Sequence, residues 1–363
     1  MKITDAIQAQ NTNITTGVSP ANEDKTLRGR NIKVFNLGGN VRQAVVYAAP
    51  VHFRDAKGQW QDIDNMLEET ATSSGRNVLR NHAGRVHVEF PVCADGHSMA
   101  SLSDGNRTFA WRFEQEVQPV AAVVRTGLQL YKERLIHKAK SLPIFANWTQ
   151  DELEMADLSA ELESPQEQRA ILPKLNAETL YENVLDGVSV RYSLNGESLK
   201  EDIILANSEA LSRATIRLPK DYAYEVTAQS KLHVCDNKTN EMLFVMDAPL
   251  VYDADGRETI AQIELTDVGE YVRLSYRLDE AFLSEAAFPV TIDPVVRTAT
   301  TDAVVSDAYI WKKRPDNNYG SVHLMRCGLG DGGESILRQW LANDAPPAGQ
   351  QAENRLDKLL HLA

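Results

Sequence analysis

Apolar and polar residues alternate with a period of two in several short stretches of the chain. The alternation is regular at Val86, Val88 and Phe90; at Phe109, Trp111 and Phe113; at Val188, Val190, Tyr192 and Leu194; and at Val272, Leu274, Tyr276 and Leu278. Successive side chains of a strand point to opposite faces, so this pattern predicts strands with one buried side and one solvent-facing side. Such half-buried strands are typical of antiparallel sheets.

Short turn sequences separate the extended stretches. They are Asp55-Ala-Lys-Gly58, Asp95-Gly96, Asp104-Gly105, Asn195-Gly196 and Asp255-Gly256. Asn-Gly and Asp-Gly pairs tolerate the positive φ angles that tight hairpins require. Hairpins spread over the whole chain predict a mainly β protein made of antiparallel β-sandwich-like domains, and they disfavour parallel βαβ units.

One stretch departs from the β pattern. The residues from Trp148 to Ala170 include seven carboxylates, one Arg and no Lys. Thr149-Gln-Asp-Glu152 matches a capping box, which predicts that a helix begins there. Met155, Leu158 and Leu162 follow at helical spacing as a narrow apolar stripe, and Pro165 disfavours continuation of the helix. We expect one short acidic helix with its carboxylates in solvent, either a connector between the two β-rich halves or an inserted arm.

These patterns divide the chain into five parts. Residues 1–28 are polar and aperiodic, which predicts a disordered arm. The remaining parts are a β-rich domain at 29–145, the acidic helical connector at 146–170, a second β-sandwich-like domain at 171–298, and a further segment at 299–363. A chain of 363 residues is long enough for several domains with their own cores.

Composition and charge narrow the range of partners. The formal net charge is −13 and the pI is about 5.2, so the chain as a whole repels a polyanion. We therefore expect no nucleic-acid partner, although this total leaves room for a local basic patch. No apolar run is long enough for a membrane span, and no signal peptide is visible.

Metal-binding and catalytic motifs are missing from the sequence. Cys93, Cys235 and Cys327 lie far apart without ligand spacing, so we expect mostly buried thiols and neither a zinc site nor a disulfide scaffold. There is no HExxH, no GxSxG and no P-loop. We therefore predict no metal, no cofactor and no catalytic residues.

Three further stretches have a structural and a functional interpretation. Lys200-Glu201-Asp202 could suggest acid–base chemistry, but we expect Lys200 and Glu201 on the solvent side of a strand, in weak surface pairs. Tyr252 to Gly256 resembles the start of a calcium loop, yet its Gly comes too early and a hairpin turn fits better. The basic stretch from Tyr131 to Lys140 predicts a solvated strand or short helix face.

Three longer segments carry a family resemblance: VFNLGGNVRQAVVYAAPVHFRDAKGQWQDIDNML (34–67), VLDGVSVRYSLNGESLKEDIIL (184–205) and AAFPVTIDPVV (286–296). They resemble the N-terminal region of large bacterial surface proteins of the RHS/YD-repeat type. In that family a DNRLRE domain follows, a β-sandwich related to carbohydrate-binding module family 96. Residues 307–310 (DAYI), 315–320 (PDNNYG) and, loosely, 333–338 resemble its start. Gln339-Trp340 depart from the pattern, and we expect 299–363 to be a partial, truncated domain.

The resemblance implies a non-catalytic secreted or cell-surface module that serves adhesion or glycan binding. In such proteins it can also shield and deliver a C-terminal effector, as in polymorphic toxins. Within the DNRLRE-like segment we expect Trp311, Lys312, Arg314 and Tyr319 to bind an acidic polysaccharide, because aromatic platforms and cations suit such a ligand. Tyr319 could instead fill the edge of the sandwich. The alternatives are a polysaccharide lyase or hydrolase and a purely structural stalk or shell segment.

Overall fold

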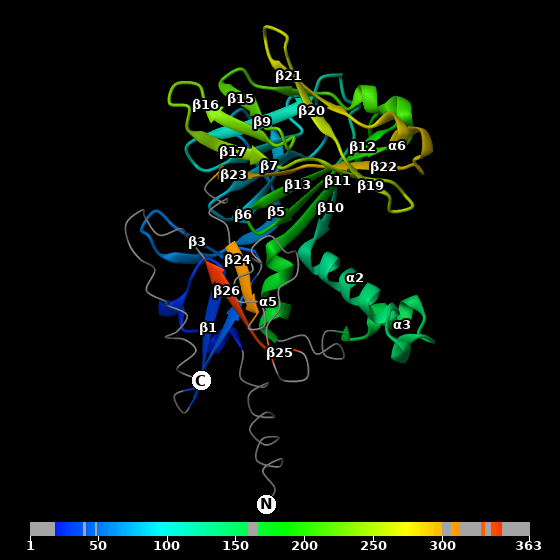
Figure 1. The fold of residues 1–363 in the computed structure, drawn as a ribbon. Coiled ribbons are helices and arrows are strands. Elements are labelled where there is room, and N and C mark those ends of the chain that lie inside the picture. The colour runs from blue at the N-terminus through cyan, green and yellow to red at the C-terminus, as the bar shows by residue number, and fades with distance from the viewer. Residues whose placement is uncertain are drawn as a thin grey trace, which may run out of the picture. The chain divides into compact units, whose positions relative to one another are not determined.

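The computed structural model describes residues 19–38, 41–47, 49–158, 166–299, 306–311, 328–330 and 335–342. For 166–170 and for the three ranges after 299, only the backbone elements are described. The chain divides into two compact units, the first ending at Thr298 and the second beginning at Ala299. The first unit holds almost all of the described residues and is coloured from blue to orange in Figure 1.

The larger sheet of the first unit has eleven strands among the described residues, and every pair in it is antiparallel. Its main path is β10 (Val123–Thr126), β11 (Asn176–Leu185), β12 (Val188–Asn195), β13 (Ser198–Leu205), β23 (Val295–Thr298), β17 (Met242–Met246), β16 (Leu232–Asp236) and β15 (Tyr222–Val226). Beside this path lie β22 (Val290–Asp293), β18 (Leu250–Tyr252) and β19 (Glu258–Ile260).

The smaller sheet is also antiparallel and has eight strands in the described part of the chain. Their order is β20 (Gln262–Asp267), β21 (Val272–Arg277), β14 (Ile216–Leu218), β9 (Thr108–Phe113), β8 (Ala100–Ser103), β7 (His87–Pro91), β6 (Asn77–Ala83) and β5 (Asp64–Ala71). Two separate hairpins precede it in the chain: β1 (Ile32–Gly38) with β2 (Val41–Val46), and β3 (His52–Arg54) with β4 (Trp60–Asp62).

The two large sheets face each other across a single hydrophobic core. Phe90 on β7 stacks on Tyr192 of β12 with ring centroids 5.0 Å apart. Phe109 on β9 stacks on Phe244 of β17 at 5.5 Å. The alternating residues named above point into this core, apart from Val272, which is half-buried. The predicted mainly β, antiparallel, sandwich-like fold is therefore confirmed.

The sandwich combines strands from 29–145 and 171–298. Ile216 on β14 pairs with Phe113 on β9 in the smaller sheet, and β10 pairs with β11 in the larger one. The two stretches thus build one sandwich together rather than one each. The alternation of burial determines which side of a strand faces the core, but it carries no information about which strand lies next to it.

Helices are more numerous than the sequence pattern indicates. The described ones are η1 (Pro20–Asn22), η2 (Lys25–Leu27), α2 (Gly127–Lys140), η3 (Pro143–Phe145), α3 (Gln150–Met155), α5 (Gln166–Leu175), η4 (Ser208–Arg213) and α6 (Glu280–Glu285). The predicted capping box is present: Thr149 caps α3 and the Glu152 carboxylate accepts the Thr149 amide at 2.7 Å. The predicted apolar stripe was wrong at Met155, whose exposed fraction is 82%.

The second unit contains a small antiparallel sheet in the order β24 (Ser306–Trp311), β26 (Ser335–Ala342) and β25 (Gly328–Gly330). Ala308 pairs with Trp340, and Ile310 pairs with Arg338. Gln339 and Trp340, which depart from the family pattern, lie within β26 and continue its strand. The chain around 312–327 lies outside the described residues.

The cysteines differ from the expectation of buried thiols. Cys235 on β16 is buried, and burial raises the pKa of its thiol. Cys93 is exposed, so the prediction was wrong there, and Cys327 lies outside the described residues. The predicted hairpin turn at Asp255-Gly256 is present between β18 and β19, where the Asp253 carboxylate accepts the amides of Asp255 and Arg257.

Glu201 lies in the core, which overturns the expectation of a solvent-facing position. Neighbouring residues of a strand face opposite sides, and Glu201 shares the inner side of β13 with Leu199 and Ile203. Its Oε1 accepts a hydrogen bond from Trp111 Nε1 of the opposite sheet at 2.8 Å. Lys200 faces outward, as expected, and its Nζ lies 3.0 Å from Asp202 Oδ1.

Burial raises the pKa of Glu201 to about 7, although the hydrogen bond from Trp111 acts in the opposite direction. The unfolded chain titrates this carboxyl near its ordinary value of 4.5. Between these two values the unfolded state releases a proton that the folded state keeps. The free energy of unfolding therefore falls as the pH rises from about 4.5 to about 7.

We expect Glu201→Gln to remove this pH dependence, because the amide keeps the shape and the acceptor for Trp111 but does not titrate. The wild-type chain should lose up to about 3 kcal/mol of stability between pH 5 and pH 8, and the variant should not. Urea unfolding at both pH values measures this. Glu264→Gln is the control, since Glu264 pairs with Arg277 on the surface. Equal pH dependence in wild type and Glu201→Gln would contradict the assignment.

Candidate nucleic-acid interface

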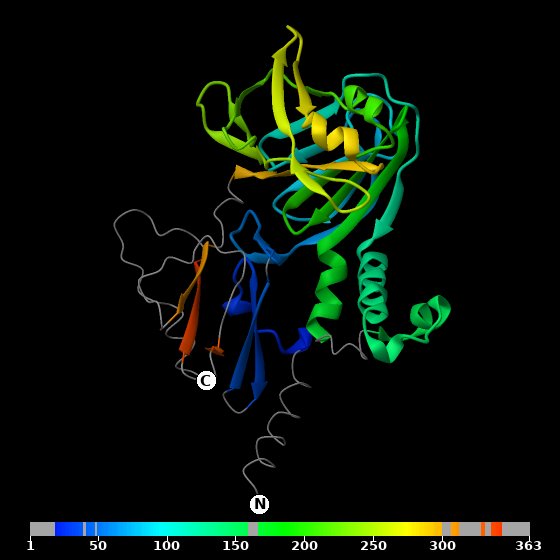
Figure 2. The same ribbon diagram turned by 45° about the vertical axis from the view of Figure 1, so that its right-hand side comes forward.

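The helical arm, residues 127–175, is an insertion between two paired strands. Val123 on β10 pairs with Leu180 on β11, and Thr126 pairs with Ala177, so the chain leaves the sheet and returns to the neighbouring position. Between these points it forms α2, η3, α3 and α5. Figures 1 and 2 show α2 and α3 extending beyond the ends of β10 and β11, away from the sandwich.

Local sequence determines where α2 begins. The Thr126 side chain accepts the Gln129 amide at 3.3 Å, and the Gln129 side chain accepts the Thr126 amide at 2.7 Å, a complete capping box. The next residue, Gly127, lies against the end of α5. A Cβ atom here would be 1.7 Å from the Pro173 carbonyl oxygen, so only glycine allows this approach.

The inner side of α2 packs on the rest of the arm. Tyr131, Leu135, Ile136 and Ala139 are buried and form a separate small core with Phe145, Leu153 and Leu158. The spacing of three and four residues is that of one helix face. The basic stretch from Tyr131 to Lys140 is therefore an amphipathic helix, which decides between the two alternatives that the sequence left open.

The solvent-exposed part of α2 carries a concentration of positive charge. Lys132, Arg134, Lys138 and Lys140 are all exposed, and none of the four forms an ion pair with another described residue. Glu133 is the acidic residue of this helix, and it pairs with Arg125 at the end of β10. The helix thus presents unpaired cations to solvent on a chain whose net charge is −13.

Exposed apolar residues lie next to this basic helix in the chain. Ile144 is 78% exposed and Trp148 is 41% exposed, with the Trp148 ring edge-on to Phe145 at 5.1 Å. Cations combined with accessible aromatic rings are typical of surfaces that bind single-stranded nucleic acid. The carboxylates of α3 lie on a separate helix of the arm, so α2 would attract a polyanion and α3 would repel it.

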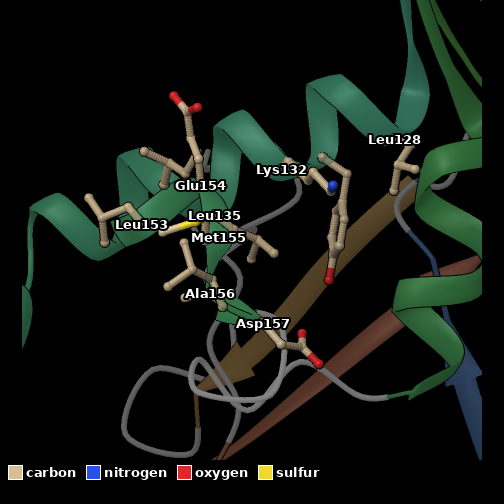
Figure 3. Close-up of a pocket in the computed structure, with 11 residues that line it drawn as sticks. Leu128, Lys132, Leu135, Leu153, Glu154, Met155, Ala156 and Asp157 are labelled. Atoms are coloured by element: carbon tan, nitrogen blue, oxygen red, sulfur yellow. The ribbon is translucent and has the colours of Figure 1, made fainter. Parts of the chain in front are cut away.

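A groove of about 370 Å³ separates α2 from α3. Its walls are mainly apolar, and Figure 3 shows Leu135, Leu153 and Met155 around it, with the Glu154 carboxylate directed outward. Lys132 lies at its edge on α2.

A second group of ionisable residues links the N-terminal hairpins. Arg28 Nε donates to Glu23 Oε1 at 2.7 Å, and its guanidinium also donates to Asp62 at 3.2 Å. Lys33 Nζ donates to Asp62 Oδ1 at 3.1 Å, and His52 Nε2 lies 3.4 Å from the same oxygen. A histidine with carboxylates and cations is a set that can cleave phosphodiesters.

Burial makes that group a structural cluster. The side chains of Glu23, Arg28 and His52 are at most 5% exposed, so a substrate cannot reach them; Asp62 alone is open to solvent. Burial raises the pKa of Asp62, but the nearby His52 ring and the charges of Lys33 and Arg28 outweigh this and hold its pKa well below the usual range. In the described part of the chain, no group of His, Cys, Asp and Glu has a metal-binding arrangement.

The predicted carbohydrate site cannot be placed in this geometry. Lys312, Arg314 and Tyr319 lie outside the described residues, and Trp311 is described only as the last residue of β24. The residues that the structure brings together instead are the cations of α2. Their sequence signal was present in the stretch 131–140, but the whole-chain charge argued against it.

Comparison with known proteins gives distant relatives. No family model matches the chain. It is 22% identical over 311 residues to the tRNA nuclease WapA of Bacillus subtilis (strain 168). It is 21% identical to the tRNA3(Ser)-specific nuclease WapA of Bacillus spizizenii and to the tRNA(Glu)-specific nuclease WapA of Bacillus subtilis subsp. natto. Each match covers 81% of this chain and 11% of the relative, so the chain spans about a tenth of the length of these proteins.

These relatives correct three predictions. Each is named as a nuclease that acts on tRNA, which contradicts a non-catalytic adhesion or glycan-binding module, a protein that is not an enzyme, and the exclusion of nucleic acid. That exclusion rested on the net charge of the whole chain, whereas a nucleic acid responds to the local field. Within the described residues, no helix is both long and apolar enough to span a membrane.

We expect Arg28→Ala to destabilise the first unit by about 3–5 kcal/mol, because the substitution leaves the buried Glu23 carboxylate without its guanidinium. Urea unfolding and hydrogen exchange of β1 to β4 measure the loss. Arg42→Ala is the matched control: its guanidinium is 57% exposed and lies 3.8 Å from Asp24, so we expect a change within about 1 kcal/mol. Similar losses in both variants would contradict a structural role specific to the buried cluster.

Proposed function

We propose that the chain is a β-rich part of a toxin-like protein directed at tRNA, and that the exposed cations of α2 form a tRNA-contacting surface. The observation that carries this proposal is the set of four exposed, unpaired cations on one helix of an acidic chain. The similarity to tRNA nucleases over 81% of the chain supports the choice of tRNA as the polyanion.

Helix geometry suits a phosphate backbone. Lys132 and Lys140 are eight residues apart, which is about 12 Å along a helix axis. A duplex carries a phosphate charge about every 1.7 Å of its axis, so this length passes several phosphates. Arg134 and Lys138 are one turn apart and lie on the same side of α2. Such contacts fix position and are independent of base sequence.

We propose the cleavage of tRNA for a protein of the relatives' full length, and not for the part described here. The chain spans 11% of the relatives' length, and the described histidine–carboxylate cluster that resembles a cleavage site is closed to solvent. We assign tRNA contact to α2 and assign no described residue to the bond-breaking step. The motifs at 34–67, 184–205 and 286–296 support membership of the RHS/YD-repeat surface proteins, and with it a secreted or cell-surface location of the polymorphic-toxin type.

We expect the double substitution Arg134→Ala and Lys138→Ala to weaken binding of tRNA roughly tenfold near 100 mM salt, because two phosphate contacts are lost. The slope of log affinity against log salt concentration should become shallower by about two. Fluorescence anisotropy of labelled tRNA over a salt series measures both quantities, and circular dichroism verifies that the helix remains folded.

The matched control is Lys57→Ala with Lys238→Ala, which removes the same charge from two exposed turns of the same unit. We expect this variant to change the affinity by less than twofold, since long-range charge effects are screened. The proposal fails if wild-type protein does not bind tRNA, or if the control and the α2 variant weaken binding equally.

A further inference from the structure

The outer face of the smaller sheet carries three arginines in one row across neighbouring strands. Arg217 on β14 lies directly opposite Arg112 on β9 and, on its other side, opposite Arg273 on β21. The residues next to them in each strand are buried in the core, so the arginines point to the outer face (β9 and β21 are labelled in Figure 1). Like charges directly opposite each other destabilise a sheet unless they have partners.

Arg273 has a partner that neutralises it. Its Nε donates to Glu114 Oε2 at 2.6 Å, and its Nη2 donates to Glu114 Oε1 at 2.5 Å. The bond from Arg273 lowers the pKa of Glu114 to about 2, so this carboxylate is ionised at neutral pH. A second carboxylate on the same face, Glu264, pairs with Arg277 at 2.7 Å. Both negative charges are therefore engaged by an arginine.

Arg112 and Arg217 have no carboxylate partner among the described residues. Arg112 Nη1 donates to the Gly96 carbonyl oxygen at 2.7 Å, and this acceptor carries no charge. The Arg217 guanidinium lies over the Tyr271 ring, 4.2 Å from its centroid. Arg217 Nε is covered and forms no hydrogen bond, so a partner would meet the terminal nitrogens of this half-buried side chain. Two positive charges on neighbouring strands thus remain uncompensated.

The two guanidinium groups are held from opposite sides of the row. Gly96 belongs to the segment between β7 and β8, on one side of β9, whereas Tyr271 directly precedes β21, on the far side of β14. The positive charge is therefore spread across several strands. Such a spread suits a chain of phosphate groups, which can present successive charges, better than a single small anion. A guanidinium also matches the oxygens of a phosphate with two parallel hydrogen bonds.

We infer that Arg112 and Arg217 form a second tRNA-contacting surface, on which the phosphate backbone lies across β9 and β14. The inference rests on the proposed function, which supplies tRNA as the polyanion. The surface lies on the sandwich and is separate from the cations of α2 in the helical arm. Its contacts position the backbone and carry no base specificity.

The double substitution Arg112→Gln with Arg217→Gln should weaken binding of labelled tRNA about tenfold near 100 mM salt. The slope of log affinity against log salt concentration should become shallower by about two, because two phosphate contacts are lost. Fluorescence anisotropy over a salt series measures both. Urea should unfold the variant at the wild-type concentration or above it, because opposed like charges are removed. A lower urea midpoint would mark a structural role and overturn the inference.

The matched control is Arg80→Gln with Arg277→Gln, which removes the same charge from the same sheet. These two arginines are already paired, Arg80 with Glu89 and Arg277 with Glu264. The control should change the affinity by less than about twofold, since distant charges are screened. Equal losses in the two double variants would overturn the inference, because they would reflect net charge alone.

The same titrations separate this inference from the proposed function. Unchanged binding in the Arg112 and Arg217 variant, with weakened binding in Arg134→Ala with Lys138→Ala, overturns the second surface and leaves the role of α2 intact. If wild-type protein does not bind tRNA, the proposed function fails and the second surface fails with it.

A measurement on the wild-type protein needs no substitution. Phenylglyoxal modifies accessible guanidinium groups, and peptide mass spectrometry locates the products. Bound tRNA should slow modification of Arg112 and Arg217 about threefold or more and leave Arg277 unchanged within about twofold. Polyglutamate, which offers carboxylates in place of phosphates, should protect them less. An absence of protection by tRNA overturns the inference, and equal protection by polyglutamate overturns the choice of phosphate.

Discussion

The packing of the two large sheets against each other is the contact on which the rest of the first unit depends. Aromatic residues on β7 and β9 stack on those of β12 and β17, and the indole of Trp111 donates to a carboxyl of the opposite sheet, Glu201. A buried carboxyl costs stability unless it is bonded or neutral. The raised pKa of Glu201 shows that the fold keeps it largely in the neutral form at mildly acidic pH, so the interior tolerates one titratable group.

The ladder between β10 and β11 holds the two ends of the helical arm in neighbouring positions of the larger sheet. The arm then has its own small core around Tyr131, Leu135 and Leu153, separate from that of the sandwich. Gly127 sets the approach of α2 to α5. Functional surfaces are commonly found on such segments, since a scaffold positions them at little cost to its own packing.

Charge is distributed unevenly over the same arm. The cations of α2 have no ion-pair partner among the described residues, and α3 presents carboxylates. The net charge of the whole chain therefore describes neither surface. The groove between them has mainly apolar walls. The net charge of the whole chain did not anticipate this local distribution.

Period-two alternation and Asp-Gly or Asn-Gly turns were sufficient to predict a mainly β, antiparallel fold, and the capping box at Thr149 located the start of α3. These features are local, because the pleat of a strand and the first turn of a helix depend on residues a few positions apart. The tertiary structure decided which strands are neighbours, that Glu201 faces inward, and that residues 131–140 form a helix with a buried side and a cationic side. Those outcomes depend on contacts between distant parts of the chain, such as Trp111 with Glu201 and Gly127 with Pro173, which no local pattern records.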